Sequence, residues 1–505
     1  MRAFVAGLGL VAVLGMIACT DFDGLSSQYG EGPPDQSVTP PDDLAGEDLA
    51  MSVDALAGVD SNADLSPNCT DGVLSDGETD LDCGGACGPC DVGRACLVDV
   101  DCQTGSCSSN RCELVSGPPS WVQVGTAPTN TGTAPIPRND LVVELGPDGN
   151  LYAIAGLDPD GTTRLNNTEK LDQTALTWAA ANNIAARRSQ AASAATTTGI
   201  YLLYGDKQTG FETSVEKLTA PPNWSTVTGV TYTASGAGAT FGSDGKIYIA
   251  GGSDGANALK ALKAFTPGDA NVAPLKDLSF ARDRTTVTVG SDGRIFAIGG
   301  HAAGVTLSSV EAYTSVGDTW TTVAPLPEAR AATRAVLAHD GRIYVPGGAD
   351  LGNGVVHRTA YAYSAGAAPL GNRWAKLAPL AVPRYRHGVG VGIDGRVYVV
   401  SGSNLLGFVR SVEAYGPVVT VVPDNTKAGM SIMVSGSNFA QNATVRFSLG
   451  SAGAAPIGTG TTDGAGVLAT TTVMIPVGTA TGATRVYARD TRSRYPVSAK
   501  FTVNP

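Results

Sequence analysis

The chain has 505 residues, a formal net charge of −12 and only 16% charged residues. No Lys or Arg lies between Arg2 and Arg94, whereas from Arg94 onward 33 basic residues slightly outnumber 29 acidic ones. The acidity is therefore confined to the N-terminal arm, and the near-neutral remainder lacks the basic footprint of a nucleic-acid partner. The 64 glycines and the weak helical periodicity favour short strands joined by tight turns.

Residues 1–19 are the first predicted element, a secretory signal peptide. The segment has a basic start, an apolar run and the ending "GMIAC" at Cys19. This ending resembles a bacterial lipoprotein signal, in which the cysteine becomes the lipidated N-terminus, although Met16 stands where that family usually has Leu. We therefore expect lipidation at Cys19, with ordinary cleavage and no lipid as the alternative.

Residues 20–67 predict a disordered acidic linker. Aromatic side chains are nearly absent and the charges share one sign, so no core can offset the entropy lost on ordering. We expect self-repulsion to extend this tether and to hold the rest of the chain away from a membrane.

Residues 68–114 form a Cys-rich module that contains every cysteine except Cys19. The eight are Cys69, Cys83, Cys87, Cys90, Cys96, Cys102, Cys107 and Cys112. A segment this short, with few large apolar side chains, needs covalent cross-links to hold a fold. Because the module has one Cys-x-x-Cys pair and no His, we favour four disulfides over zinc and leave their pairing open.

One phrase then recurs six times along the chain. Its copies are "DGNLYAIAG" from Asp148, "TGIYLLYG" from Thr198, "DGKIYIAGG" from Asp244, "DGRIFAIGG" from Asp292, "DGRIYVPGG" from Asp340 and "DGRVYVVSG" from Asp394. The later copies are 48, 48 and 54 residues apart, and each is followed by further strand-sized pieces. A period of this length with four strands per unit predicts the blades of a β-propeller.

Tryptophan positions predict how the ring closes. Four copies are followed by a Trp, namely Trp178, Trp224, Trp320 and Trp374. The last copy ends at "SVEAYG" with no Trp after it, while Trp121 precedes the first copy. We expect "SWVQVG" from Ser120 to supply the outer strand of the last blade, which leaves no free sheet edge. The predicted ring has six blades and spans residues 119–416.

The phrases "DGRIYVPGG", "VEAY" and "VPRYRHGVGVGIDGRVYVVSG" resemble kelch repeats. The resemblance implies an all-β chain with a six-bladed kelch β-propeller. Residues 417–505 are rich in Val and Thr with frequent turn signals, and predict a small β-sandwich. Their stretch "VSGSNFAQNATVRF" resembles the immunoglobulin-like IPT/TIG family.

Arginine occupies one register of the repeats. Counted ten residues before each turn, the repeated structural arginines are Arg138, Arg187, Arg282, Arg330 and Arg384, with Ala234 in the remaining copy. We expect each to bond loop carbonyls, or alternatively to join a ring that binds an anion. Two residues later the residue type varies, as Asp140, Ser189, Gly236, Arg284, Ala332 and Arg386. A ligand site and unconstrained loops both explain this variation. We name Arg284, Arg386, Tyr385 and His387 as the candidate ligand rim.

An oxidative enzyme is the rival interpretation, since the galactose oxidase family is similar in plan. That family's copper site implies two His, two Tyr and a Cys bonded to one Tyr. Here Arg386 separates Tyr385 from His387, no Cys follows Cys112 and the tail has no His. We therefore expect no catalytic residues, no metal and no cofactor.

Taken together, these features predict a secreted protein, lipid-anchored at the bacterial outer membrane or cell surface. We expect a monomer that binds a protein or glycan through one propeller face, touching the membrane only through its lipid and binding no nucleic acid. The alternatives are the copper enzyme and a structural spacer without a ligand.

Overall fold

The computed structural model describes residues 107–108, 111–112, 120–126, 137–173, 177–219, 223–230, 232–269, 271–365, 374–491 and 496–505. These residues belong to one compact unit, Leu65–Pro505. Within them every regular element is a β-strand, which confirms the predicted all-β class. No helix in these ranges is long and apolar enough to cross a membrane. The predicted signal peptide, acidic linker and most of the Cys-rich module lie outside the described residues.

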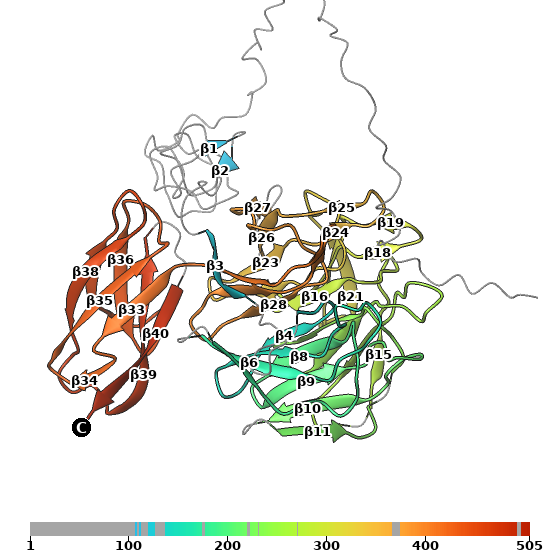
Figure 1. Ribbon diagram of the computed structural model, residues 1–505, viewed down its shortest axis with the longest axis horizontal. Coiled ribbons are helices and arrows are strands. Elements are labelled where there is room, and N and C mark those ends of the chain that lie inside the picture. The colour runs from blue at the N-terminus through green and yellow to red at the C-terminus, as the bar shows by residue number, and fades with distance from the viewer. Residues whose placement is uncertain are drawn as a thin grey trace, which may run out of the picture. The chain divides into compact units, whose positions relative to one another are not determined.

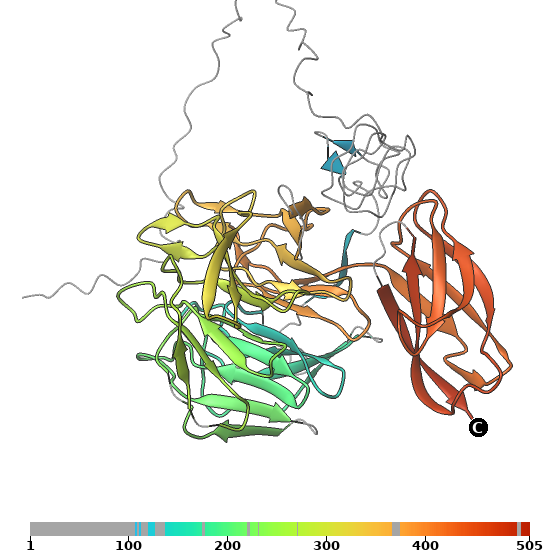
Figure 2. The same cartoon turned by 180° about the vertical axis from the view of Figure 1, so that it is seen from behind.

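Six antiparallel sheets of four strands each make up most of the described chain (Figures 1 and 2). We number them sheets 1 to 6 in the order of their first strands. The first strands are β4 (Val142–Leu145), β8 (Ala192–Thr196), β12 (Gly238–Phe241), β16 (Thr286–Val289), β22 (Val336–Leu337) and β28 (Gly388–Val391). The second strands are β5 (Leu151–Ile154), β9 (Gly199–Leu203), β13 (Ile247–Ala250), β17 (Ile295–Ile298), β23 (Arg342–Pro346) and β29 (Val397–Val400).

The third and fourth strands complete each sheet. The third strands are β6 (Thr168–Asp172), β10 (Val215–Thr219), β14 (Leu262–Phe265), β20 (Val310–Thr314), β26 (Ala360–Ser364) and β32 (Ser411–Tyr415). The fourth strands are β7 (Thr177–Ala180), β11 (Asn223–Val227), β15 (Ala273–Leu275), β21 (Thr319–Val323), β27 (Trp374–Lys376) and β3 (Trp121–Thr126). Sheets 1 to 5 therefore each take their four strands from one continuous stretch of the chain. Sheet 6 is the exception, because its fourth strand, β3, precedes the other strands of all six sheets in the sequence.

The repeated phrase forms the turn between first and second strands. In sheet 1 the Asp148 carboxylate accepts hydrogen bonds from the Asn150 backbone N–H at 3.2 Å and from the Tyr152 hydroxyl at 2.8 Å. Gly149 has φ of 80°, a left-handed conformation that a glycine adopts without steric cost. The same Asp–Tyr bond, at 2.7 Å, recurs in sheets 3, 5 and 6. The phrase recurs because each sheet needs this turn and an apolar second strand, which is buried in all six sheets.

The six sheets follow one another in a closed cycle. First strands contact in the order β4, β8, β12, β16, β22, β28 and back to β4. An apolar core lies between each pair of neighbouring sheets, including one between sheets 6 and 1 that contains Val143, Leu151 and Tyr398. Strand β3 pairs with β32, and Trp121 packs 5.3 Å from the ring of Tyr415. An N-terminal segment thus closes sheet 6, as the tryptophan positions predicted.

Two further sheets follow the cycle. Strands β33 (Val418–Val422), β35 (Ser431–Ser437) and β38 (Leu468–Met474) form one of them. The other contains, in spatial order, β34 (Asn425–Lys427), β40 (Pro496–Asn504), β39 (Gly482–Asp490), β36 (Thr444–Leu449) and β37 (Pro456–Thr461). Their core includes Val434, Phe447 and Phe501. These eight strands lie within the range predicted for the second β-domain.

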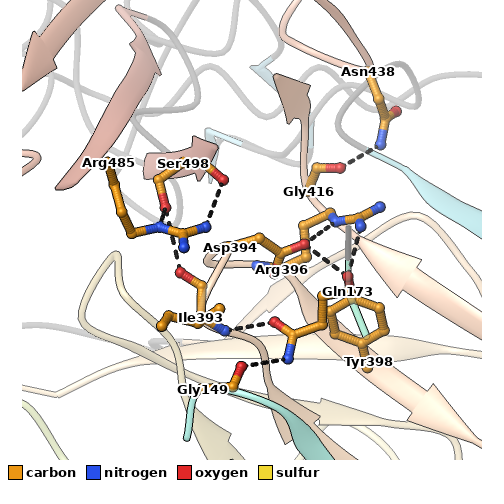
Figure 3. A network of polar contacts seen from close by, with 10 residues as sticks. All are labelled: Gly149, Gln173, Ile393, Asp394, Arg396, Tyr398, Gly416, Asn438, Arg485 and Ser498. Carbon is orange, nitrogen blue, oxygen red and sulfur yellow. Dashed lines mark hydrogen bonds and ion pairs between the residues drawn. The ribbon is translucent and has the colours of Figure 1, made fainter. Parts of the chain in front are cut away.

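Polar contacts tie these sheets to sheet 6 (Figure 3). The Asn438 amide donates to the carbonyls of Gly416 at 2.8 Å and Ser120 at 2.9 Å. The Ser498 backbone N–H donates to the Asp394 carbonyl at 2.9 Å, and the Arg485 Nε donates to the Ser498 hydroxyl at 2.7 Å. The Ser498 bond engages the Asp394 turn, which follows the first strand of sheet 6. The candidate site lies at the other end of the first strands, where they begin.

Candidate functional site

A buried arginine precedes the first strand in five of the six sheets. They are Arg138, Arg188, Arg282, Arg330 and Arg384, each with at most 1% of its surface exposed. In sheet 4 the Arg282 Nη1 donates to the carbonyls of Gly299 at 2.7 Å and Ser309 at 3.0 Å. Arg188, Arg330 and Arg384 make the equivalent pairs of bonds in their own sheets. The guanidinium therefore joins the second strand to the third within one sheet.

These equivalent positions before the first strands are here called the arginine column. The structure corrects one of its predicted members. Arg187 is exposed, and the buried arginine of sheet 2 is Arg188. The first hairpin of sheet 2 turns through Thr197 and Thr198 alone, since Thr196 pairs with Gly199. The other first hairpins use longer turns, so a count backward from the turn is displaced by one residue in sheet 2. The positions two residues after these arginines, where the residue type varies from sheet to sheet, are here called the variable column. The same displacement puts Gln190, not Ser189, in this column.

Each buried arginine has a carboxylate partner that sequence analysis missed. Glu216, Glu311 and Glu413 on the third strands accept from Arg188, Arg282 and Arg384 at 2.5, 2.7 and 2.5 Å, and Glu169 pairs with Arg138. Glu216, Glu311 and Glu413 also accept backbone N–H groups from the loop before the arginine, as Glu311 does from Ser279 at 2.8 Å. The repeated "VEAY" contained this signal, because its Glu alternates with apolar residues that face the core.

Sheets 3 and 5 show that a buried arginine and a carboxylate partner occur together. Sheet 3 has Ala234 in place of Arg and Lys263 in place of Glu, so it lacks both charges of the pair. Sheet 5 keeps Arg330 but has Tyr361 on its third strand, and there Glu328 supplies the carboxylate at 2.7 Å. The guanidinium of Arg330 also lies 4.9 Å from the Tyr361 ring centre. Because every buried arginine of this column keeps a carboxylate partner, and sheet 3 lacks both, this column acts as scaffold.

Main-chain bonds from the same column join neighbouring sheets. The carbonyl of each column residue accepts the N–H of a glycine that ends the second strand of the preceding sheet. The pairs are Arg138 with Gly402, Arg188 with Gly156, Ala234 with Gly205, Arg282 with Gly252, Arg330 with Gly300 and Arg384 with Gly348, at 2.8 to 3.2 Å. These six bonds run once around the cycle of sheets.

Two residues later, the variable column surrounds the centre of the ring. Its members Asp140, Gln190, Gly236, Arg284, Ala332 and Arg386 all have φ between 48° and 62°. The backbone N–H of each donates to the carbonyl of the preceding member, as Asp140 does to Arg386 at 2.7 Å. Arg284 departs from this pattern, because its N–H donates to the Asp283 carboxylate at 2.7 Å. A Cβ at Gly236 would lie 2.2 Å from that carboxylate, so any larger residue there would displace the Asp283 side chain.

The variable column borders a small cavity of about 30 Å³, here called the mouth cavity. Arg284, Arg334 and Arg386 line it from sheets 4, 5 and 6, and Asp140 lines it from sheet 1. The Arg386 Nε lies 3.9 Å from the Asp140 Oδ2. Two further carboxylates, Asp206 and Asp283, lie close to these groups. Burial raises the pKa of Asp283 to about 6, and the charges of Asp206 and Asp140 add to the shift.

Arg334 lines the mouth cavity and reaches across the ring, and a second, deeper cavity lies among the first strands. The Arg334 Nη2 donates to the Ala191 carbonyl of sheet 2 at 2.6 Å, so the side chain spans from sheet 5 to the opposite wall. The deeper cavity, of about 260 Å³, is lined by residues of all six first-strand segments, including Glu144 and Ser193. Burial raises the pKa of Glu144 to about 7, while the Ser193 hydroxyl bond and the Arg334 charge oppose the shift.

The four predicted rim residues divide into two pairs. Arg284 and Arg386 line the mouth cavity, and their side chains are 22% and 12% exposed. Tyr385 and His387 are buried, and of these two only His387 lines the mouth cavity. The His387 Nε2 bonds the Pro346 carbonyl at 3.0 Å, and burial lowers the pKa of His387 to about 3. His387 therefore borders the cavity as a neutral side chain.

Hairpins between second and third strands surround the mouth cavity. Each hairpin starts at a residue that pairs with the residue directly before a variable-column position. For example, His301 pairs with Asp283, which precedes Arg284. In sheets 4, 5 and 6 the hairpins form β18 (His301–Ala302) with β19 (Val305–Thr306), β24 (Ala349–Asp350) with β25 (Val355–Val356), and β30 (Ser403–Asn404) with β31 (Gly407–Phe408). The first two lie side by side in Figure 1, linked by the Gly352 N–H and the Thr306 hydroxyl at 3.1 Å.

These three hairpins carry exposed apolar side chains. Val305, Val355, Leu405 and Leu406 are 59%, 47%, 62% and 96% exposed. In sheets 1 to 3 the corresponding tips contain Asp158, Asp160, Lys207 and Asp254. The surroundings of the mouth cavity thus have an apolar half over sheets 4 to 6 and a polar half over sheets 1 to 3.

No group of three or more His, Cys, Asp or Glu side chains in the described ranges is arranged to hold a metal ion. The disulfides predicted in the Cys-rich module lie outside these ranges. Of that module the structure describes only the backbones of β1 (Cys107–Ser108) and β2 (Arg111–Cys112). Those two strands pair with Cys107 opposite Cys112.

Comparison with known families finds the kelch motif at residues 285–327. This range covers sheet 4 from β16 to β21. No curated protein matches the chain. The motif and the antiparallel sheets together give the chain a kelch-type β-structure, a kind of structure associated with binding.

Proposed function

We propose that this kelch-type chain is a secreted, lipid-anchored surface protein that binds a protein or glycan ligand. In this proposal the six sheets are the blades of one kelch β-propeller, and the eight C-terminal strands form an immunoglobulin-like sandwich of the IPT/TIG type. The acidic linker and the disulfide-bonded module space the propeller from the membrane. The ligand binds at the mouth cavity and the hairpins around it.

One observation carries the binding proposal, namely the contrast between two adjacent columns. The buried column repeats Arg in five sheets and has a bonding role in each. Two residues away, the backbone geometry stays the same while the side chains differ from sheet to sheet. A rigid frame that presents different side chains around one cavity is suited to recognition.

The contacts at the Asp394 turn, at the end of the first strands opposite the mouth cavity, support the mouth as the binding face. The Asp394 turn is engaged by Ser498, and the Gln173 side chain bridges the Gly149 carbonyl and the Ile393 N–H there (Figure 3). The mouth cavity lies at the other end of the first strands and has no such contact from the C-terminal strands among the described residues. We therefore place the ligand at the mouth.

The test is a binding screen of the full chain against arrays of glycans and bacterial surface proteins, with the double variant Arg284→Ala/Arg386→Ala in parallel. We expect specific binding by the wild-type chain and its loss in the double variant. A hit that both proteins bind equally would contradict the mouth as the site. Absence of any hit, or stoichiometric copper with oxidase activity, would contradict the binding function.

A further inference from the structure

Three arginines from consecutive sheets line the mouth cavity. Arg284, Arg334 and Arg386 line it from sheets 4, 5 and 6, which also carry the exposed apolar hairpins. We propose that the mouth cavity receives a carboxylate of a partner protein, and that the hairpin tips contact apolar side chains flanking that carboxylate. The inference rests on the proposed function and names the chemistry of its ligand.

Charge favours an anion in this cavity. Its lining contains three arginines and one carboxylate, Asp140, and His387 is neutral. The Asp283 carboxylate lies outside this lining, 3.7 Å from the Arg284 Nε, and offsets part of the positive charge. Arg334 is half-buried, and burial lowers its pKa, so its positive charge is incompletely solvated. The opposing charges that act on Arg334 are those of Glu144 and then Asp140. The pKa of Glu144, about 7, leaves that group only partly ionised at neutral pH. An incoming carboxylate would compensate this charge, because guanidinium groups bind carboxylates with paired hydrogen bonds.

Size favours a single small group. The cavity encloses about 30 Å³, and one water needs roughly 10–15 Å³ measured in this way. A carboxylate fits such a space, whereas a sugar ring has to stay outside it. A glycan would also leave the apolar tips of Val305, Val355 and Leu406 without a suitable contact. Side chains of a protein segment can fill the cavity and cover these tips together.

The backbone at the two rim arginines points to the same use. Arg284 and Arg386 have φ of 48° and 56°, a conformation that is unfavourable for long side chains. Gly236 and Ala332 occupy equivalent positions, so the frame itself needs no long side chain there. Strain of this kind is commonly retained where a side chain has a binding role.

A library of phage-displayed linear peptides, selected on the immobilised full chain, tests this proposal. We expect selected peptides to contain Asp, Glu or a free C-terminal carboxylate flanked by apolar residues. Conversion of that carboxylate to its amide should weaken binding by about tenfold or more, as should Arg284→Gln or Arg386→Gln. The control is Arg294→Gln, an arginine at the opposite turn whose Nε bonds Asp292 at 2.8 Å. It should bind like the wild type.

The outcomes separate this inference from the function beneath it. Selection of basic or uncharged peptides, of phosphate-dependent peptides only, or of no peptide would overturn the carboxylate proposal. If glycans still bind the wild-type chain and not the Arg284→Ala/Arg386→Ala variant, the binding function survives that result. Peptides that bind the wild-type chain and the Arg284→Ala/Arg386→Ala variant equally would place the apolar contact elsewhere and overturn the inference. Unchanged melting temperatures of the Gln variants show that any loss of binding is not a loss of fold.

Discussion

At the scale of single residues, the buried Arg–Glu pairs explain why charge is tolerated inside the ring. Arg282 has two carbonyls and the Glu311 carboxylate within 3.0 Å, and Glu311 also accepts the Ser279 N–H. Such a pair contributes little net stability by comparison with apolar packing, yet the loss of one partner leaves a buried charge uncompensated. The joint absence of both charges in sheet 3 fits this asymmetry.

Arg282→Ala or Glu311→Gln should each lower the free energy of unfolding by about 3–5 kcal/mol. The double variant should lose clearly less than the sum, because the two side chains form one unit. Denaturant unfolding of the four proteins measures the coupling. As a matched control, Arg187→Ala removes an exposed arginine and should change stability by less than about 0.5 kcal/mol. Additive losses would show that the pair is not a unit.

Glu144 gives a prediction on pH. Its pKa rises from 4.5 to about 7 on folding because burial penalises the charged form. The group therefore costs nothing below pH 4.5, and its penalty grows as the pH rises through the range up to about 7. Glu144→Gln keeps an acceptor for Ser193 and should be more stable than the wild type above neutral pH, by roughly 1–3 kcal/mol. Melting temperatures that differ equally at pH 4 and pH 8 would contradict this account.

At the scale of elements, strand β3 closes the cycle of sheets. Trp121 has 8% of its surface exposed and packs on Tyr415, whose ring is 5.5 Å from that of Tyr344 in the next sheet. Loss of β3 would expose the edge of β32 and the apolar surface that the tryptophan covers.

Trp121→Ala should cost about 3–5 kcal/mol, since it removes a large buried side chain. Deletion of residues 119–127 should lower the melting temperature strongly, whereas deletion of residues 40–48 from the acidic linker should leave it unchanged. Thermal unfolding by circular dichroism compares the three proteins. Equal melting temperatures for the two deletions would show that β3 does not stabilise the ring.

Much of this architecture could be predicted because it repeats. The Asp-Gly phrase marks every first turn except that of sheet 2, and the stray Trp121 marks the closing strand. The Arg188 register was missed because one turn is shorter, and the Glu column was missed because its partners lie about thirty residues away in sequence. Arg334 could not be assigned from sequence, since its contact with Ala191 depends on two sheets facing each other across the ring.

At the scale of the whole molecule, the proposal joins a membrane anchor to a binding ring. Mass spectrometry of the mature N-terminus should find a diacylglyceryl group on Cys19, and Cys19→Ser should release the protein from membranes.

Thiol titration of the denatured, unreduced chain should find no free thiol among Cys69–Cys112. An unmodified N-terminus at another residue would remove the lipid anchor from the proposal, and bound zinc with free thiols would replace the disulfides.

The separation of scaffold from site is the central claim, and two double variants test it most directly. Arg282→Ala/Arg384→Ala removes two scaffold arginines, and Arg284→Ala/Arg386→Ala removes two mouth arginines that lie two residues further along. We predict that the first pair lowers the melting temperature strongly. The second pair should leave the melting temperature nearly unchanged and abolish binding of the ligand found by the screen. Equal losses of stability in the two variants, with ligand binding unaffected by the mouth pair, would contradict the account.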